Sequence, residues 1–515
     1  MKLHSPPGRR RSPQAAQHPL RASFVGVAAL LAVSACTGRD SAPGAGVGAA
    51  APPADGASDG GPGDAGERPP LPPSTCTPHG AARNPLISHI FTADPNAVVY
   101  GDRVYLYASH DVDGQDNFDM VDYHVFSSGD MANWQDHGLA LDAASLGWAS
   151  NLFAPGACQK NGKYYLYMPD GGSSIGVAVA DDPGGPFVDP IGGPLVTRQA
   201  SMNTDVTWLF DPACLVGDDG QGYLYFGGGD DGAVRDNARV IRLGDDMISL
   251  ADARATTIAI PRFFEALHVH EHDGTYFLQY SADFTMGAAL EYLTSRDPMA
   301  GFQYQGVLLP NGDINSGNNS HGSLIDFSDK AYLFYHNRKL MQQLGTNKVN
   351  NRSVAVQEVS YGADGTLDPV AMSTQDTTAL QIKCLDAFVE VQAETLAAEK
   401  GIEVEGKAGE TVRVAQIDDG DWVGYSQVDF RGGATTLVAQ VASASGGGVI
   451  DVRIDGCDGF TPEAGSSIGT CAVANTGGAA IFAGLSCTLT ETSGAHDVCL
   501  YFSGGGFELD SWHLE

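Results

Sequence analysis

One short hairpin recurs five times along this chain of 515 residues. Its second strand appears as DRVYLYASH, GKYYLYMPD, GQGYLYFGG, GTYFLQYSA and DKAYLFYHN. Aligned on their central aromatic residues, successive copies are 60, 58, 54 and 55 residues apart: Tyr105, Tyr165, Tyr223, Phe277 and Tyr332. A period in the fifties fits four-stranded blades placed around an axis, whereas a β-sandwich would not repeat its hairpin at this interval. The sequence therefore predicts an all-β fold with a five-bladed β-propeller over residues 76–385.

The first strand of each hairpin begins with a residue that can be compared between copies. Counting back 11 or 12 residues from the aligned aromatics gives Asp94, Ala154, Asp211, Glu265 and His321. The innermost strands of a propeller line its axis, so equivalent positions converge at one mouth of the channel. A lone aspartate before proline can instead serve a turn at the start of a strand. Three acidic residues at five phased positions favour a shared site.

Clustered carboxylates without Cys or His spacing of the metal-ligand type favour acid–base hydrolysis over metal catalysis. GxSxG, HExxH and phosphate-binding glycine loops do not occur in a convincing setting. A glycosidase needs one carboxylic acid for the leaving oxygen and one carboxylate to activate water, roughly 6.5–9.5 Å apart when configuration inverts. A third carboxylate beside the acid would raise its pKa and keep it protonated.

The region from about Asn84 to Val370 resembles the family 43 glycoside hydrolases. Matching stretches include NPLISHIFTADPNAVVYGDRVYLYASHD, FAPGACQKNGKYYLYMPDGG, RFFEALHVHEHDGTYFLQYS and NRSVAVQEVSYGADGTLDPV. The resemblance implies an inverting hydrolase acting on hemicellulose, with Asp94 as general base, Glu265 as general acid and Asp211 as pKa modulator. It also implies that His321 helps to hold a channel ion, commonly calcium, and that no cofactor is required for the chemistry.

We expect the enzyme to remove α-L-arabinofuranosyl groups from arabinoxylan, because the N-terminal stretch and the C-terminal accessory domain resemble arabinoxylan arabinofuranohydrolases more than plain β-xylosidases. A β-xylosidase, or a bifunctional xylosidase/arabinofuranosidase, remains an alternative, since the carboxylate trio is common to both. A non-catalytic, sugar-binding surface lipoprotein is the alternative from another class. A pure binder, however, has no need to keep an acid beside its modulator.

Aromatic side chains near these positions are candidates for the walls of a sugar pocket. They are Trp148, Trp208, Phe264 and Phe153. Each is equally compatible with a place in the propeller core. Members of the family often carry WAP before the second inner strand, where this chain has Phe153 in FAP.

In residues 386–515 the sequence consists of short runs of alternating apolar and polar residues, separated by glycine-rich turns. This pattern predicts a β-sandwich (jelly-roll) domain. This segment resembles a family 6 carbohydrate-binding module. By position, the resemblance implies Glu394, Tyr425 and Glu508 at a sugar site, and Glu394 with Asp510 at a structural calcium site. NTGG is usually followed by Trp, but Ala479 stands here. The module therefore either binds xylan through a surviving half of the site or acts as a structural partner.

The N-terminal residues 1–36 read as a lipoprotein-type signal peptide. Arginines precede the apolar stretch FVGVAALLAVSA, which is too short to span a bilayer, and VSAC resembles a lipobox with Cys36 as the lipidated residue. An ordinary secretory signal cleaved nearby is the alternative. Residues 37–75, nearly all Ala, Gly, Pro, Asp and Ser, are expected to form a disordered linker. We therefore expect an exported protein, lipid-anchored at the bacterial cell surface or outer membrane, or otherwise periplasmic or secreted.

The formal net charge of −33 disfavours nucleic acid and anionic membrane surfaces as partners, and leaves neutral polysaccharides and small cations open. We expect a monomer whose membrane contact is limited to the lipid anchor. Apart from Cys36, eight cysteines remain, an even number that suits disulfides in an oxidising compartment. Cys76 with Cys384 could join the ends of the propeller. Plausible local pairs are Cys457 with Cys471 and Cys487 with Cys499, while Cys158 and Cys214 are either free or buried inert thiols.

Overall fold

The structure is a computed structural model that describes residues 74, 76–229, 237–283, 287–315, 319–373, 376–456 and 465–515. The predicted signal peptide, Cys36 and nearly all of the predicted linker lie outside the described residues. Among the described residues, none of the helices has the length and apolar character needed to cross a bilayer. Strands dominate, and the α-helices α1 (Ala143–Leu146) and α2 (Lys339–Gln343) are short, so the all-β prediction is confirmed.

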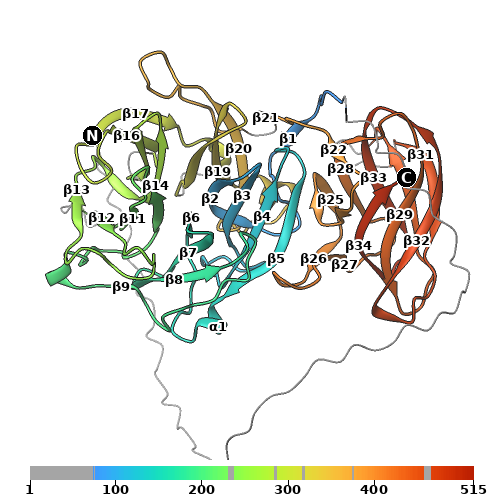
Figure 1. Cartoon of the computed structure of the whole chain (residues 1–515), viewed down its shortest axis with the longest axis horizontal. Helices are drawn as coiled ribbons and strands as arrows, with labels where there is room; N and C mark the ends of the chain where they lie inside the picture. The colour runs from blue at the N-terminus through green and yellow to red at the C-terminus, as the bar shows by residue number, and fades with distance from the viewer. Residues whose placement is uncertain are drawn as a thin grey trace, which may run out of the picture. The chain divides into compact units, whose positions relative to one another are not determined.

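Antiparallel sheets follow one another along the chain, beginning at Thr92 (Figure 1). Sheet 1 contains β2 (Thr92–Tyr100), β3 (Arg103–His110), β4 (Asp122–Ser128) and β5 (Trp134–Asp142). Sheet 2 contains β6 (Gly156–Lys160), β7 (Lys163–Asp170), β8 (Ser174–Ala180) and β9 (Val196–Thr197). Sheet 3 contains β10 (Ala213–Val216), β11 (Gly222–Phe226), β12 (Ala238–Arg242) and β13 (Thr256–Ile258).

The same succession continues to Val359. Sheet 4 contains β14 (Phe263–His272), β15 (Thr275–Ala282), β16 (Leu290–Ser295) and β17 (Gln303–Leu309). Sheet 5 contains β18 (Gly322–Phe327), β19 (Lys330–Asn337) and β20 (Ser353–Val359). In each sheet the first two strands form the hairpin that recurs in the sequence.

Apolar side chains pack between neighbouring sheets rather than in one central core. Separate buried clusters join sheets 1 and 2, 2 and 3, 3 and 4, and 4 and 5. A further cluster joins sheet 1 to sheet 5, with Leu106 and Phe334 among its members. The first strands also contact one another in a cycle, from β2 to β6, β10, β14, β18 and back to β2. The sheets therefore close into a ring, and the heads of these first strands meet at its centre.

Disulfides join elements that are distant in sequence. Cys76 pairs with Cys384, as predicted, close to the pairing of β1 (Ala81–Arg83) with β21 (Asp376–Leu380). Cys158 and Cys214 are not free thiols, because they bond to each other across the contact between β6 and β10.

The pairing expected within the C-terminal domain was wrong. Cys471 bonds Cys487, because β31 (Ser466–Ala472) packs against β32 (Gly478–Thr492). The sequence interval suggested nearer partners, but the packing of strands decides the pairs. Cys499 is also disulfide-bonded, and Cys457 lies outside the described residues.

The C-terminal segment folds into two sheets around one apolar core, drawn in orange to red in Figure 1. One sheet contains β22 (Leu385–Asp386), β28 (Trp422–Asp429), β33 (Ala495–Ser503), β30 (Val449–Ile454) and β31, with β25 (Ala398–Lys400) beside β28. The other contains β26 (Glu403–Glu405), β27 (Arg413–Ala415), β34 (Phe507–Leu514), β29 (Ala434–Ser443) and β32, with β23 (Val391–Gln392) beside β34. This is the predicted β-sandwich.

A short strand of the C-terminal segment joins the first sheet of the ring. β24 (Thr395–Leu396) pairs antiparallel with β5, so that Thr395 lies opposite Gln135. Asn133 strengthens this junction, because its amide nitrogen donates to the Ser426 carbonyl at 3.0 Å and its amide oxygen accepts from the Ser426 N–H at 2.8 Å. The sandwich is therefore hydrogen-bonded to the ring as well as tethered to it.

Candidate active site

The heads of the first strands carry unusual backbone geometry. Asp94 and Asp211 have φ of 49° and 48°, and Ala266, directly after Glu265, has φ of 64°. Aspartate tolerates the left-handed region better than most residues. The ladders of β2 and β14 also shift register beside Asp94 and Glu265. Such bulges turn side chains away from the regular alternation of a strand, here toward the centre of the ring.

All five phased positions line one cavity of about 560 Å³. They are Asp94, Ala154, Asp211, Glu265 and His321. The volume lies in the range of sites that hold a small organic molecule. Residues separated by more than 220 positions in the chain are thus brought to one opening, as the repeat spacing predicts.

Asp94 is held as an anion by a dense set of donors. Arg352 Nη1 lies 2.6 Å from Asp94 Oδ1, and Ser109 donates to Oδ2 at 2.9 Å. His336 Nδ1 accepts from the Asp94 backbone N–H at 3.1 Å and lies 3.3 Å from Oδ1. Burial by itself would raise the pKa of Asp94, but the Arg352 charge and the His336 contact outweigh it and hold the pKa below its usual range. Asp94 is therefore a carboxylate at any working pH.

Glu265 has the opposite electrostatic environment. Burial, followed by the negative charge of Asp94, raises its pKa to about 8. Its Oε1 is buried without a hydrogen-bond partner among the described residues. A carboxyl group that stays protonated near neutral pH and has an uncommitted oxygen in the cavity can donate a proton to a bound molecule.

Asp211 is coupled to Glu265. Burial, then the charges of Glu265 and Asp94, raise the Asp211 pKa well above its usual value, so the pair holds a proton that one group alone would release. Asp211 Oδ2 accepts from the Ala266 N–H at 2.8 Å. This bond fixes the peptide next to Glu265 and hence the direction of the Glu265 side chain.

Apolar side chains form the walls of the cavity. Trp208, Phe264 and Phe153 line it as predicted, together with Phe118, Met120 and Phe210. The Trp208 ring meets Phe264 edge-on, with centroids 5.5 Å apart. A sugar ring could rest its C–H face on such a wall.

Trp148 is not brought to this cavity. Its indole N–H donates to Asp189 Oδ2 at 2.8 Å, and its ring packs on Gly176 in the cluster between sheets 1 and 2. Sequence cannot distinguish an aromatic residue of the inter-sheet core from one at the pocket wall, because both belong to inward-facing runs.

His321 lies beside Asp94. Its Nδ1 lies 3.6 Å from Asp94 Oδ1, the same oxygen that accepts from Arg352. Burial lowers the His321 pKa to about 4 despite the nearby Asp94 charge, so the ring is neutral. A neutral imidazole is the form that can bind a cation, so the channel ion that the resemblance implied stays a prediction, and we derive no step through it.

Sequence reasoning missed Arg352, which comes from the last sheet and reaches Asp94 in the first. Arg352 also forms a fork with Asp111, through Nε to Oδ2 at 2.9 Å and Nη2 to Oδ1 at 2.7 Å. It is 1 % exposed. An arginine directly before the apolar run SVAV was the available signal, because a buried guanidinium requires carboxylate partners.

The sugar-site candidates of the sandwich do not gather. Tyr425 is buried in the core against Trp512 and donates to the Ala393 carbonyl at 2.8 Å, so its ring is unavailable to a sugar. Glu508 pairs with Arg413 at 2.5 Å. Tyr425 was named only by its position in the resemblance, and position alone could not separate a sugar-binding residue from a core residue.

Glu394 and Asp510 share a second cavity, lined on one side by Gln135 and His137 of β5. Glu394 is 2 % exposed, and its Oε2 has no hydrogen-bond partner among the described residues. Burial raises its pKa well above the usual value. An orphaned buried carboxylate beside further oxygen donors suits a hard cation, so the residues fit calcium.

The family-model comparison assigns the ring. Residues 82–367 match the model of the glycosyl hydrolases family 43, more than half of the chain. The chain belongs to glycosyl hydrolase family 43. Residues 392–515 match the carbohydrate binding module (family 6). The family 43 chain is therefore an O-glycosyl hydrolase with an attached module, as the sequence predicted.

Known proteins resemble this family 43 chain over different shares of its length. An arabinoxylan arabinofuranohydrolase of Bacillus subtilis is 36 % identical over 491 residues, which cover 86 % of this chain and 94 % of the relative. The xylosidase/arabinosidase 43A of Humicola insolens is 34 % identical over 339 residues, 55 % of this chain and 97 % of the relative. A crystal structure of a family 43 arabinoxylan arabinofuranohydrolase from Bacillus subtilis, in complex with cellotetraose, aligns with TM-score 0.76 and 35 % identity over 84 % of this chain and 97 % of that one. This structural alignment includes both the ring and the sandwich.

Proposed function

We propose that this chain removes α-L-arabinofuranosyl side groups from arabinoxylan by inverting acid–base hydrolysis. Asp94 is the general base that activates water, and Glu265 is the general acid that protonates the leaving oxygen. Asp211 is the partner whose titration is coupled to that of the acid, and it positions Glu265 through the Ala266 N–H. The observation that carries the proposal is the opposite electrostatics of Asp94 and Glu265 within one cavity.

The assignment of base and acid follows from the proton each group holds. Asp94 accepts hydrogen bonds from Arg352 and Ser109, which support only the ionised form. Glu265 lacks such donors on Oε1 and keeps its proton at neutral pH. Water activated by Asp94 attacks the anomeric carbon while Glu265 gives its proton to the departing oxygen, and the two residues exchange protonation states in the process.

Arabinofuranose is favoured as the released sugar by the extent of the similarity. The Bacillus subtilis arabinoxylan arabinofuranohydrolase matches across both the ring and the sandwich, whereas the Humicola insolens xylosidase/arabinosidase matches about half of this chain. That second relative supports the alternative, a β-xylosidase or a bifunctional xylosidase/arabinofuranosidase. The apolar walls around the carboxylates suit one terminal sugar, which is compatible with either.

Proton NMR of products released from arabinoxylan tests the proposal, because it reports sugar, linkage and anomeric configuration together. We expect free arabinose that appears first as the β anomer, the product of inversion at an α linkage. Xylose as the main product would favour the alternative, a β-xylosidase or a bifunctional xylosidase/arabinofuranosidase. If no pentose is released from arabinoxylan, arabinan or aryl pentosides, the proposed hydrolase activity is rejected.

The architecture belongs to the same proposal. The five described sheets between 92 and 359 support a five-bladed propeller, with the predicted domain limits at 76–385 and 386–515. A structural calcium held by Glu394 and Asp510 would neutralise the buried carboxylate near the junction with β5. The module then supports the ring, and any sugar it binds does not stack on Tyr425. Export by a lipid-anchored route through Cys36, and a monomeric state, remain part of the proposal.

A further inference from the structure

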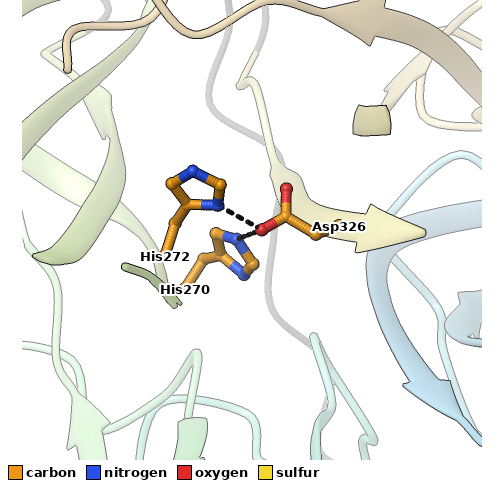
Figure 2. A group of neighbouring side chains, drawn as sticks. All are labelled: His270, His272 and Asp326. Atoms are coloured by element: carbon orange, nitrogen blue, oxygen red, sulfur yellow. Dashed lines mark hydrogen bonds and ion pairs between the residues drawn. The ribbon is translucent and has the colours of Figure 1, made fainter. Parts of the chain in front are cut away.

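A cluster of side chains outside the catalytic cavity has the composition of a metal site. His270 and His272 lie two residues apart near the end of β14, so both imidazoles project from one face of the strand. Asp326 lies near the end of β18 in the next sheet. Their ligand atoms lie within 4.8 Å of one another, and Figure 2 shows both rings turned toward the Asp326 carboxylate.

A single oxygen is the focus of the cluster. His270 Nε2 lies 3.1 Å and His272 Nδ1 lies 2.6 Å from the same Asp326 Oδ2 (Figure 2). In a tetrahedral zinc site, bonds of about 2.0–2.2 Å separate ligand atoms by roughly 3.3–3.5 Å. Rotations that open these contacts by less than about 1 Å would therefore admit an ion between the three atoms.

The surrounding residues orient the ligands in the manner of an outer ligand shell. Tyr361 donates to Asp326 Oδ1 at 3.1 Å, and its ring stacks on His272 with centroids 3.8 Å apart. The far nitrogen of His272, Nε2, faces Asp273 Oδ2 at 3.6 Å. A carboxylate behind a ligating imidazole fixes the ring and raises its basicity, which is the common arrangement at metal centres.

Access and charge also suit an ion. The three side chains are 15 %, 33 % and 37 % exposed, so a hydrated ion can reach them and a water molecule can complete the coordination. His268 lies two residues before His270, on the same face of the strand. Its Nε2 is not free to bind the ion, because that atom contacts the Leu324 carbonyl at 3.2 Å. Two imidazoles and one carboxylate prefer zinc and its neighbours over calcium or magnesium.

We propose that His270, His272 and Asp326 bind one zinc-type divalent transition-metal ion that bridges β14 and β18 across sheets 4 and 5. The ion's role is structural. Glu265 lies seven residues before His272 on β14, which corresponds to roughly 20 Å along the strand, so the ion does not take part in glycoside cleavage. The site shares no residue with the calcium site proposed at Glu394 and Asp510, and its ligands are imidazoles as well as a carboxylate.

Zinc titration of the metal-free full chain, without an affinity tag and with calcium present, tests the proposal. Calorimetry should give one zinc site per chain that is lost in Asp326→Asn and in His272→Gln, while His496→Gln retains it. His496 is the matched control, because it pairs with Asp455 at 2.8 Å and belongs to no group of three potential metal ligands among the described residues. Saturating zinc should raise the melting temperature of wild type and H496Q by about 4 °C and leave both site variants unchanged.

Cobalt gives a second readout, because the visible absorption of bound cobalt reports histidine and carboxylate ligation directly. Hydrolysis by D326N and H272Q should stay within about twofold of wild type, as expected for a site remote from Glu265. Should D326N fail to fold, H272Q alone decides the outcome. Equal zinc binding by wild type and the site variants, or no binding by wild type at millimolar zinc, would overturn the proposal.

Discussion

Replacing Glu265 with glutamine removes the proton that we assign to bond cleavage while it preserves the size of the side chain. The reaction depends on this proton to the extent that the leaving group needs it. For a sugar hydroxyl of xylan, which leaves poorly as an anion, we expect the rate to fall by roughly 10²–10⁴-fold, the usual contribution of a general acid. For an aryl arabinofuranoside, whose phenolate leaves readily, the fall should be much smaller.

The pH dependence of kcat/KM follows from the raised pKa of Glu265. With a pKa of about 8, close to nine-tenths of the groups are protonated at pH 7, compared with about 0.3 % for the ordinary value of 4.5. Burial and the Asp94 charge therefore increase the amount of active acid roughly 300-fold at neutral pH. Between pH 7 and pH 9, kcat/KM of wild type should fall about tenfold.

Steady-state kinetics on arabinoxylan and on an aryl arabinofuranoside, from pH 4 to pH 10, measure both effects. In E265Q the basic limb near pH 8 should vanish on the aryl substrate, because the group that titrates there is gone. Circular dichroism establishes that the variant is folded. The acid assignment is refuted if E265Q keeps that limb, or if the two substrates lose activity equally.

Other substitutions probe the same network and the ring around it. Glu265 has a higher pKa in the folded state than in the unfolded state, so the folded state binds its proton more tightly. The resulting contribution to the free energy of unfolding is complete below about pH 4.5 and is lost as pH rises through about 8. The melting temperature of E265Q should therefore exceed that of wild type by a margin that grows from pH 5 to pH 9, and a constant margin would contradict this. Arg352→Met should raise the pKa of Asp94 and bring an acidic limb of kcat/KM that wild type lacks toward the assay range, and a profile as flat on the acidic side as that of wild type would show that Arg352 does not control the base. Replacing Cys158 and Cys214 together with serine should destabilise the ring by about 2–4 kcal/mol in denaturant unfolding, and wild-type stability would mean that the bond does not form in solution.

The sequence was sufficient for those features that repeat. The hairpin interval located the first strands, and their heads supplied Asp94, Asp211, Glu265 and His321 before any contact was known. This works because a ring places equivalent positions at equivalent heights, so one alignment within the chain replaces many unknown distances. All four residues line the same cavity.

Features that depend on contacts between different sheets were beyond this reasoning. Arg352 lies 258 residues from Asp94, and no periodic signal connects them. Trp148 and Tyr425 are candidates for sugar sites in the sequence, with the propeller core as the alternative for Trp148, and the structure places each in a core. The pairing of Cys471 likewise depends on which strands stack, which loop lengths do not determine.

The contact between Arg352 and Asp94 has a consequence for how activity arises during synthesis of the chain. Asp94 is translated early, but the guanidinium that keeps it charged arrives with the last sheet of the ring. A nascent or truncated polypeptide lacking that sheet would carry a catalytic carboxylate without its counter-ion. Hydrolysis would then begin only once the two ends of the ring have met, which makes turnover itself an indicator of completed assembly.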